Sequence, residues 1–431
     1  MIAKLLLDKK REGHALGSAE IREFIDGFTK GEIPDYQMSA MAMAICCRGM
    51  NERETADLTE AMMNSGRSLK WDFPTADKHS TGGVGDKLSF IIQPLAAACG
   101  INVPSLTGRG LGLTGGTADK LESIPGLTCS LPLDRFQSVV KEVGLSLALQ
   151  TDEICPADKK LYALRDVTGT VTSIPLIVGS ILSKKFAEGS GTLVFDVKTG
   201  RGAFMKTKES AVELATAMVK AAQLSGRKSA ALVTDMDSPL GYAVGNANEV
   251  KESLDILSRA DKGLEDIRDL SVEFAALMVS LTKGISLDDA REMCAEKLAD
   301  GSALAKFKAM VAAQGGDLDR FARLLEKPTF KFCIQAPKSG YVEDIDAEKV
   351  ARVAFRLGAG REKAGDRIDP LAGVKLAARI GDKVSTGSAL ATLESSSEPD
   401  GLERNAAELL KAFSIVSGPV VKKSLIIERI S

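Results

Sequence analysis

Residues 1–66 combine clusters of alanine, methionine and leucine with residues that start and end helices. An alanine- and methionine-rich run covers 37–48, and Asn51 with Glu54 forms the capping-box pattern of a helix start. Gly66 is a residue type at which such a helix commonly stops. The pattern predicts a helical N-terminal lobe whose methionines pack between helices or at a dimer interface.

From about residue 72 short apolar runs alternate with glycine-rich turns and helical stretches. Strand-like runs cover 103–106, 145–149, 193–197 and 230–234, and helical stretches cover 88–99 and 211–222. This alternation is typical of an α/β domain with a largely parallel sheet. A helical segment over 156–189 interrupts it and is similar in character to the N-terminal helices, so we expect it to fold with them.

The pattern changes again near residue 330. A strand-like run, Phe330–Ile334, precedes a G-D-x-V-x-x-G-x-x-L rhythm over 380–393, which resembles the lipoyl and biotinyl carrier domains. The chain has no Met-Lys-Met or Asp-Lys-Ala hairpin to carry an attached cofactor. We therefore expect a barrel-like α+β domain without a covalently bound group.

These patterns predict an α/β plus α fold with three parts. The parts are a helical lobe of residues 1–66 joined by 156–189, an α/β lobe of 67–155 and 190–329 with a mostly parallel sheet, and a C-terminal α+β barrel-like domain of 330–431.

Composition narrows the functional classes. The 431 residues carry a formal net charge of −2, which argues against a general binder of nucleic acids or membrane surfaces. The apolar run Leu5–Leu7 is too short for a signal peptide, so we expect a cytoplasmic protein. Seven cysteines without a C-x-x-C pair, and only two histidines, argue against a structural zinc site.

The first candidate for chemistry is the glycine-rich stretch 78–87, Lys-His-Ser-Thr-Gly-Gly-Val-Gly-Asp-Lys. Its glycines allow backbone N–H groups to turn toward an anion, and the helix expected from residue 88 begins beside them. Lys78, Ser80 and Ser89 add a cation and hydroxyl donors. The stretch lacks the Walker pattern, and it predicts a phosphate site of another kind.

A second glycine-rich stretch, Thr107–Glu122, also lies between a strand-like run and a helix start. Two such loops can hold one phosphate from two sides, with Thr107 and Thr117 as hydroxyl donors. We expect Arg109 and Asp119, together with Glu122, to hold the loop together.

The third cluster is Arg165, Ser180 and Lys184. Ser180 and Lys184 are four residues apart on one face of an expected helix, whereas Lys185 is a candidate for a solvated face. The uracil or thymine edge presents an acceptor, a donor and an acceptor, and arginine and lysine only donate whereas a serine hydroxyl also accepts. The hydrogen-bonding groups of Arg165, Ser180 and Lys184 therefore match the edge of uracil. They do not match cytosine, whose edge presents an acceptor, an acceptor and a donor.

At this point the chain resembles the thymidine/pyrimidine-nucleoside phosphorylase family. The matching motifs follow in order over nearly the whole chain: Lys78–Asp86, Thr107–Glu122, Tyr162–Thr168, Ser173–Pro175, Ser180–Lys185, Asp196–Gly200 and Thr234–Met236. The resemblance implies a pentosyltransferase that converts a nucleoside and phosphate reversibly into a free base and pentose 1-phosphate. It also implies a cleft between the helical and α/β lobes, closure about a hinge, and a homodimer formed through the helical lobe.

The resemblance assigns roles to the candidate residues. Phosphate is expected on Lys78, Ser80, Ser89, Thr107 and Thr117, and the base on Arg165, Ser180 and Lys184. Arg165 and Lys184 would offset the negative charge that grows on the base, and His79 would protonate its O2 or form a hydrogen bond with it. No organic cofactor is needed, and phosphate is the co-substrate.

Three residues depart from the family pattern. Thr107 replaces the usual serine and keeps its hydroxyl, whereas Leu113 replaces a histidine and leaves base and sugar preference open. Lys87 stands where the pyrimidine-nucleoside branch has a threonine that helps to bind potassium. The other ligands of that potassium site correspond to Gly85, Leu240, Ala243 and Glu252, and we expect the Lys87 ammonium to replace the ion and pair with Glu252.

Two alternatives stay open. One is a phosphoribosyltransferase of the anthranilate type, which has a similar two-lobed fold but needs an acidic metal motif. The other is a non-catalytic nucleoside-binding relative. The sequence does not decide between thymidine and uridine or fix the preferred direction of reaction.

Overall fold

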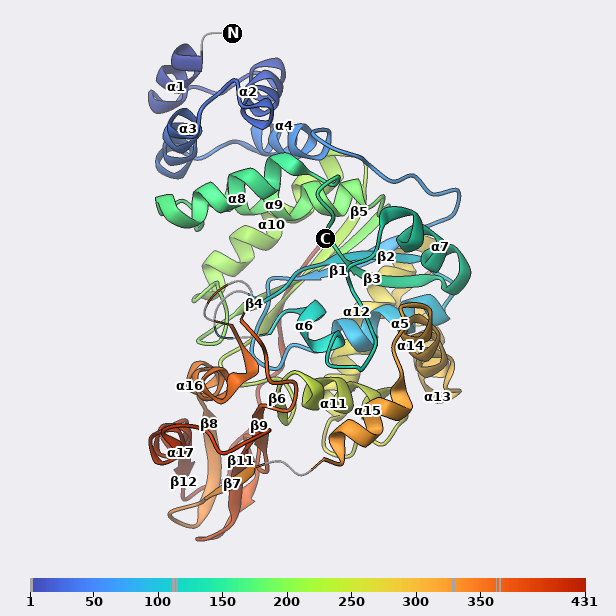
Figure 1. Ribbon diagram of the computed structural model, residues 1–431, viewed down its shortest axis with the longest axis vertical. Helices are drawn as coiled ribbons and strands as arrows, with labels where there is room; N and C mark the ends of the chain where they lie inside the picture. Colours follow the sequence, from blue (N-terminus) through green and yellow to red (C-terminus); the bar gives the residue numbers. More distant parts are fainter. Residues whose placement is uncertain (1–2, 111–112, 114, 328–329, 362, 364–365) are drawn as a thin grey trace.

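The computed structural model describes residues 3–110, 113, 115–327, 330–361, 363 and 366–431. Helices lie at one end of the elongated molecule, a sheet flanked by helices lies in the middle, and small antiparallel sheets lie at the other end (Figure 1). This arrangement confirms the predicted fold class. Among the described residues, no helix is long and apolar enough to cross a membrane.

Six helices form the helical lobe: α1 (Ala3–Arg11), α2 (Ser18–Lys30), α3 (Asp35–Arg48), α4 (Glu52–Met63), α8 (Pro156–Thr168) and α9 (Ile174–Ala187). Their shared core includes Phe28, Met41, Leu161 and Leu176, so α8 and α9 pack with the N-terminal helices. The methionines of α3 that face this core fill gaps between helices.

The start of α4 follows the predicted pattern, and its end does not. Asn51 accepts a hydrogen bond from the Glu54 N–H while the Glu54 side chain bonds back to the Asn51 N–H, which is the capping box. The helix ends at Met63, before Gly66. A Cβ atom on Gly66 would lie 2.3 Å from the Glu153 carbonyl oxygen, so glycine permits a close backbone approach there instead of ending the helix.

The central sheet has the strand order β1 (Ala76–Ser80), β4 (Thr192–Thr199), β5 (Lys228–Asp235) and β13 (Ile426–Ile430). The first three strands are parallel, and β13 joins the edge antiparallel to β5. A parallel pair, β2 (Val103–Thr107) and β3 (Leu145–Leu149), lies beside β1 and is linked to it by a parallel bridge between Thr75 and Asn102. The sheet is therefore mostly parallel, as predicted.

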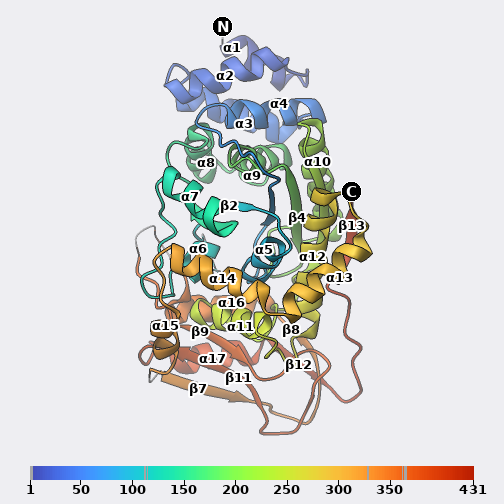
Figure 2. The same ribbon diagram turned by 90° about the vertical axis from the view of Figure 1, so that its right-hand side faces the viewer.

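Helices cover both faces of this sheet. Every residue of β4 is buried, and the strand alternates: Val194 faces one core, while Leu193 and Phe195 face another. On the first face pack α5 (Ser89–Ala98), α12 (Glu265–Lys283) and α14 (Ser302–Ala313), and on the second α9 and α10 (Lys208–Leu224) (Figure 2). The remaining helices of the lobe are α6 (Thr117–Leu121), α7 (Leu133–Val143), α11 (Ala247–Leu257), α13 (Leu287–Ala299) and α15 (Leu318–Leu325).

The C-terminal part contains two small antiparallel sheets, with the strand orders β10-β8-β12 and β6-β9-β11-β7. Its elements are β7 (Phe330–Gln335), β8 (Gly340–Ile345), α16 (Ala347–Ala354), η1 (Phe355–Ala359), β9 (Gly373–Leu376), β10 (Lys383–Val384), β11 (Ala389–Ser395), α17 (Leu402–Leu410) and β12 (Phe413–Val416). One strand of the second sheet, β6 (Ala243–Gly245), comes from earlier in the chain, and β13 returns to the central sheet. Because the two parts exchange strands, their packing is continuous, and the domain boundaries stay a prediction.

Candidate active site

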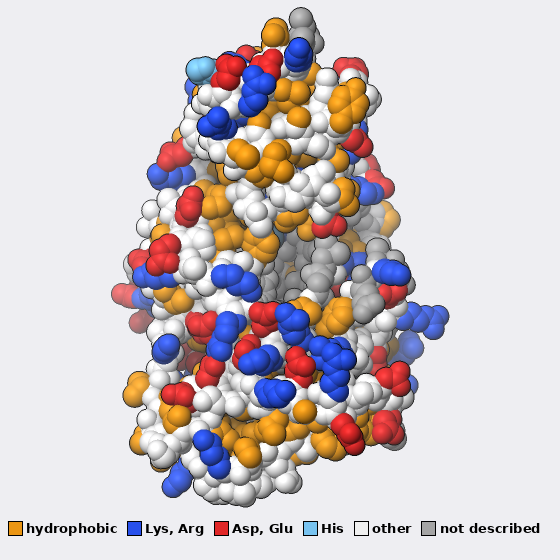
Figure 3. Space-filling model, turned by 90° about the vertical axis from the view of Figure 1, so that its left-hand side faces the viewer, with side chains coloured by type: hydrophobic (Ala, Val, Ile, Leu, Met, Phe, Trp, Pro, Cys, Tyr) orange, Lys and Arg blue, Asp and Glu red, His pale blue; other side chains and the backbone are white. Residues whose placement is uncertain are grey.

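A cavity of about 480 Å³ lies where the helical lobe meets the carboxyl ends of β1 and β2. The face of the molecule that contains it is hollowed in its middle (Figure 3). All the side chains predicted to bind phosphate or base line it, namely Lys78, His79, Ser80, Ser89, Thr107, Thr117, Arg165, Ser180 and Lys184. A cavity of this size is typical of small-molecule sites.

The first glycine-rich stretch forms the end of β1 and the loop to α5. Gly82 and Gly85 have positive φ angles of 85° and 72°, which the loop needs in order to turn back toward the sheet. The loop leads to Ser89, the first residue of α5, so the positive end of that helix dipole points at the same cavity. Loop and helix together make this side of the cavity suited to an anion.

Lys78 is a buried cation that lines the cavity. Its side chain has no solvent exposure, its Nζ lies 3.2 Å from Asp196 Oδ2, and the described residues offer that Nζ no well-aligned hydrogen-bond acceptor. Asp196 is already bound by Lys198 at 2.7 Å. Lys78 therefore shares the Asp196 carboxylate with Lys198, and its ammonium can still donate hydrogen bonds to an anionic ligand.

Ser80 and Asp86 hold the loop in shape. The Ser80 hydroxyl donates to Asp86 Oδ2 at 2.5 Å and accepts from the Gly82 N–H at 3.1 Å. Burial raises the pKa of Asp86, but the neighbouring Lys78 and Lys198 charges and the Ser80 hydroxyl outweigh it and hold this pKa well below its ordinary value. Asp86 is therefore ionised, and the one hydroxyl proton of Ser80 is directed at it.

The second glycine-rich stretch is held by its own charged residues, as expected. Asp119 Oδ2 accepts the N–H groups of Gly110 and Gly116 at 2.7 and 3.1 Å, and Arg109 bonds to Asp119 at 3.0 Å. Arg109 also bonds to Glu122 at 2.6 Å. Sequence reasoning missed Arg361, which reaches Asp119 at 2.7 Å from the C-terminal part.

Arg165 is nearly fully buried on α8. It donates to the carbonyl oxygens of Thr170, Leu176 and Val171 at 3.2, 2.9 and 2.7 Å, so three of its five donors hold the turn between α8 and α9. Burial lowers the pKa of Arg165 from its ordinary value, but that value is so high that the guanidinium stays charged.

Ser180 and Lys184 lie one turn apart on α9. Lys184 Nζ donates to Ser180 Oγ at 3.3 Å and forms a short ion pair with Asp158 of α8. Asp158 is buried and was not singled out by sequence reasoning. It fixes the direction of the Lys184 ammonium, and α9 thus presents one donor and one donor–acceptor group to the cavity.

Apolar side chains also line the cavity, and sequence reasoning did not assign them to the site. They are Val171, Ile177, Ile181, Phe204 and Leu214, with Tyr162 beside them. Ile177 and Ile181 are four residues apart on α9, as Ser180 and Lys184 are. This spacing in the sequence could have indicated that the two isoleucines line the cavity as well. A polar edge next to an apolar wall suits a flat heterocyclic base.

Comparison with known proteins decides the family. Three family models match successive parts of the chain: a glycosyl transferase family helical bundle domain over residues 4–66, a glycosyl transferase family a/b domain over 72–304, and a pyrimidine nucleoside phosphorylase C-terminal domain over 341–416. The chain is 47% identical to a pyrimidine-nucleoside phosphorylase of Geobacillus stearothermophilus over 432 residues, with 99% of each chain covered. The chain belongs to the pyrimidine-nucleoside phosphorylase family.

Other relatives agree with this assignment. The chain is 46% identical to a pyrimidine-nucleoside phosphorylase of Bacillus subtilis strain 168, covering 91% of this chain and 92% of the relative. An anthranilate phosphoribosyltransferase of Thermus thermophilus has a TM-score of 0.60 at 21% identity, covering 73% of this chain and 99% of its own. That similarity shows a shared fold only. The predicted resemblance is confirmed, and as a member of this family the chain is a pentosyltransferase.

His79 lies next to Lys78 on β1 and lines the same cavity. Burial, followed by the positive charges of Lys185, Lys184 and Lys78, lowers its pKa well below the ordinary value. The imidazole is therefore neutral near pH 7 and suited to hydrogen bonding instead of supplying a proton from a charged form.

Lys185 corrects one expectation. Instead of lying on a solvated face, it is 3% exposed and donates to Asp77 at 2.5 Å and to the Leu106 carbonyl at 2.7 Å. It also bonds to Glu188 at 3.1 Å, and Glu188 in turn accepts the Leu106 N–H at 2.8 Å. Residue 185 is turned about 100° from residue 184 around α9, so it faces β1 and β2 and ties the helical lobe to the sheet.

The residues expected at a potassium site do gather, but around Lys87. Its Nζ lies 2.7 Å from the Leu240 oxygen, 2.9 Å from the Ala243 oxygen and 2.7 Å from Glu252 Oε1. The donor set therefore does not fit a resident potassium ion, because an ammonium already stands among these oxygens. Leu113 exposes 36% of its surface, and its neighbours at 111–112 and 114 lie outside the described residues.

Proposed function

We propose that this protein catalyses the reversible phosphorolysis of pyrimidine nucleosides, giving the free base and a pentose 1-phosphate. The observation that carries this proposal is that one cavity joins a buried ammonium with spare capacity, Lys78, to the donor–acceptor trio of Arg165, Ser180 and Lys184. The cavity thus offers one group of residues for an anion and another for a uracil-like edge.

The phosphate half of the reaction is assigned to the two glycine-rich stretches. Lys78 and the start of α5 hold the dianion, and the hydroxyls of Ser89, Thr107 and Thr117 bind its oxygens. Ser80 keeps the loop folded through Asp86 until phosphate arrives, when its hydroxyl can turn to the ligand. A phosphate oxygen held in this way attacks C1′ as positive charge develops on the sugar.

The base half is assigned to α8 and α9. As the bond from C1′ to the base nitrogen breaks, its electron pair moves onto the base, and the charge is spread over the two ring carbonyl oxygens. In this proposal Arg165 and Lys184, which both line the cavity, offset this charge, and Ser180 accepts the N3–H. His79, being neutral, donates one N–H to O2 and stabilises the departing base without transferring its proton first.

Assembly and location are part of the same proposal. We infer a homodimer formed through the helical lobe, supported by the exposed apolar side chains Leu5, Tyr36 and Met43 on α1 and α3, which are 62%, 73% and 44% exposed. We also infer a cytoplasmic enzyme that uses nucleoside and phosphate, with no nucleic acid, membrane or organic cofactor involved.

The test is release of free base from a panel of nucleosides with and without phosphate. Phosphate-dependent release from uridine, deoxyuridine or thymidine supports the proposal, and their ratio gives the sugar preference. Cleavage of cytidine or a purine nucleoside alone contradicts the assignment of Arg165, Ser180 and Lys184.

The two alternatives predict other results in the same assay. A phosphoribosyltransferase would need magnesium and a pyrophosphorylated sugar. A non-catalytic relative would bind nucleosides without releasing base.

A further inference from the structure

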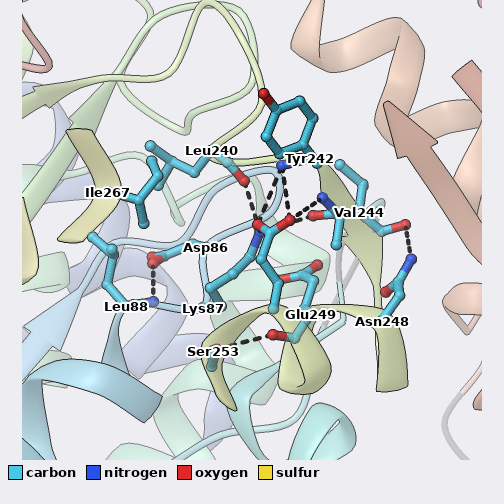
Figure 4. Close-up of polar contacts among 12 residues, drawn as sticks. Asp86, Lys87, Leu88, Leu240, Tyr242, Val244, Asn248, Glu249, Ser253 and Ile267 are labelled. Carbon is cyan, nitrogen blue, oxygen red and sulfur yellow. Dashed lines mark hydrogen bonds and ion pairs between the residues drawn. The ribbon is translucent and has the colours of Figure 1, made fainter. Parts of the chain in front are cut away.

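Lys87 has no solvent exposure and is the centre of a polar cluster next to the first glycine-rich stretch (Figure 4). All three of its donor positions are used, by Leu240 O, Ala243 O and Glu252 Oε1, at 2.7 to 2.9 Å. Glu252 Oε2 accepts the backbone N–H groups of Tyr242 and Ala243, each at 3.0 Å. One positive and one negative charge are thus paired, and every oxygen around the ammonium is satisfied.

The cluster connects the phosphate loop to the rest of the lobe. Lys87 directly follows Gly85 and Asp86, and a Cβ atom on Gly85 would lie 2.6 Å from the Leu240 oxygen. A Cβ atom on Gly241 would lie 1.9 Å from Glu252 Oε1 and 3.0 Å from Lys87 Nζ. The backbones therefore close around the ammonium too tightly for side chains at these glycines.

A second buried pair fixes the other phosphate loop to the same helix. Lys120 of α6 bonds to Glu249 at 2.7 Å, and it also donates to the Asp86 carbonyl at 2.9 Å. Glu249 and Glu252 are one turn apart on α11. Through these two carboxylates α11 holds both glycine-rich stretches, so a change at Lys87 disturbs loops that line the cavity.

We propose that Lys87 is a positioning residue that acts as a built-in monovalent cation. Its ammonium fills the oxygen cage of Leu240, Ala243 and Glu252, holds the phosphate loop in place, and makes the enzyme independent of potassium. The kinetic part of this inference rests on the proposed phosphorolysis, whereas the cage itself can be tested by stability alone.

The experiment compares the wild type, Lys87→Thr and Lys87→Met in potassium, sodium and choline chloride at a matched ionic strength of about 0.1 M. The readouts are kcat, KM for phosphate, and the thermal midpoint Tm in the absence of substrate. Lys251→Thr is the matched control, because Lys251 precedes Glu252 on α11, is half-exposed, and among the described residues forms its ion pair with Asp255.

The wild type and Lys251→Thr are expected to show the same kinetics and Tm in all three salts. Lys87→Thr provides a hydroxyl in place of the ammonium, and in choline its KM for phosphate is expected to rise by about tenfold to a hundredfold, because small misplacements near a reacting group have effects of that size. Potassium restores most of this loss and raises the Tm of Lys87→Thr only. Lys87→Met, which offers no oxygen, is not rescued.

Potassium activation or stabilisation of the wild type would overturn the proposal, whatever the variants do. The proposal would also be overturned if Lys87→Thr folds and neither its Tm nor its KM for phosphate changes with potassium. If no nucleoside is cleaved but potassium selectively stabilises Lys87→Thr, the cation role stands and the proposed function fails instead.

Discussion

Replacement of Lys78 by methionine removes the charge at the centre of the phosphate half of the site and keeps a buried chain of similar length. Lys78 Nζ lies 3.2 Å from Asp196 and 4.0 Å from Asp86, and its side chain has no solvent exposure. A phosphate oxygen about 4 Å away interacts with it by about 4 kcal/mol at an effective dielectric constant near 20. A charged hydrogen bond contributes about 1.5–3 kcal/mol by mutation.

From these values we expect Lys78→Met to lose about 2–4 kcal/mol of transition-state stabilisation, which is about 30- to 900-fold in kcat/KM for phosphate. Initial rates of base release over a range of phosphate concentrations measure it. Binding of nucleoside in the absence of phosphate should change little, because Lys78 lies on β1 whereas the proposed base-binding residues lie on α8 and α9.

Lys198→Met is the matched control. Lys198 is also fully buried and binds Asp196 at 2.7 Å and Thr234 at 3.1 Å, but it does not line the cavity. Loss of the Lys198 ammonium should lower the free energy of unfolding by about 3 kcal/mol, as when one partner of a buried ion pair is removed. Its effect on the KM for phosphate should be smaller than the effect of Lys78→Met. A Lys78→Met enzyme within about threefold of the wild type, or equal kinetic losses in both variants, would refute the assignment.

Four further predictions concern three other residues. Ser180→Ala removes the acceptor for N3–H and should lower kcat/KM for uracil nucleosides about tenfold, with a smaller change for phosphate KM, measured by steady-state kinetics. His79→Gln should leave the shape of the activity profile between pH 6.5 and 8 unchanged, because the lowered pKa of His79 keeps it neutral there. The same lowered pKa means that the unfolded state binds the proton first, so wild-type stability falls as pH drops below about 6.5, and His79→Gln should reduce that fall in denaturant titrations across pH. Asn51→Ala removes the cap of α4 and should cost about 1 kcal/mol of unfolding free energy, seen as a lower Tm with unchanged kcat.

The sequence pattern locates most elements with strong local signals. The apolar run after Gly144 predicts residues 145–149 as a strand, and β3 is Leu145–Leu149. Strand β1 carries Asp77, Lys78 and His79 and has no apolar alternation, so its position in the sheet comes from pairing with β4. The return of β13 to the central sheet is a long-range contact that no local pattern indicates.

The candidate site shows the same division. The glycine-rich stretches identify Lys78 and Thr107 as cavity residues, and the hydrogen-bonding capacity of its hydroxyl identifies Ser180. These predictions need only the residue type and its place in the sequence. Lys185 and Asp158 are paired inside the protein, and their partners lie on other elements. Which face of α9 meets the sheet decides the environment of Lys185, and that face is set by tertiary packing.

The most direct test of the central claim follows phosphate and base together. Uridine or thymidine is incubated with the enzyme and inorganic phosphate, and the free base and the phosphorus-31 signal of the pentose 1-phosphate are measured in the same sample. A single cavity that brings phosphate to C1′ predicts one pentose 1-phosphate for every base released, and no base without phosphate. Base release without phosphate, or release that leaves the phosphate unchanged, would contradict the account.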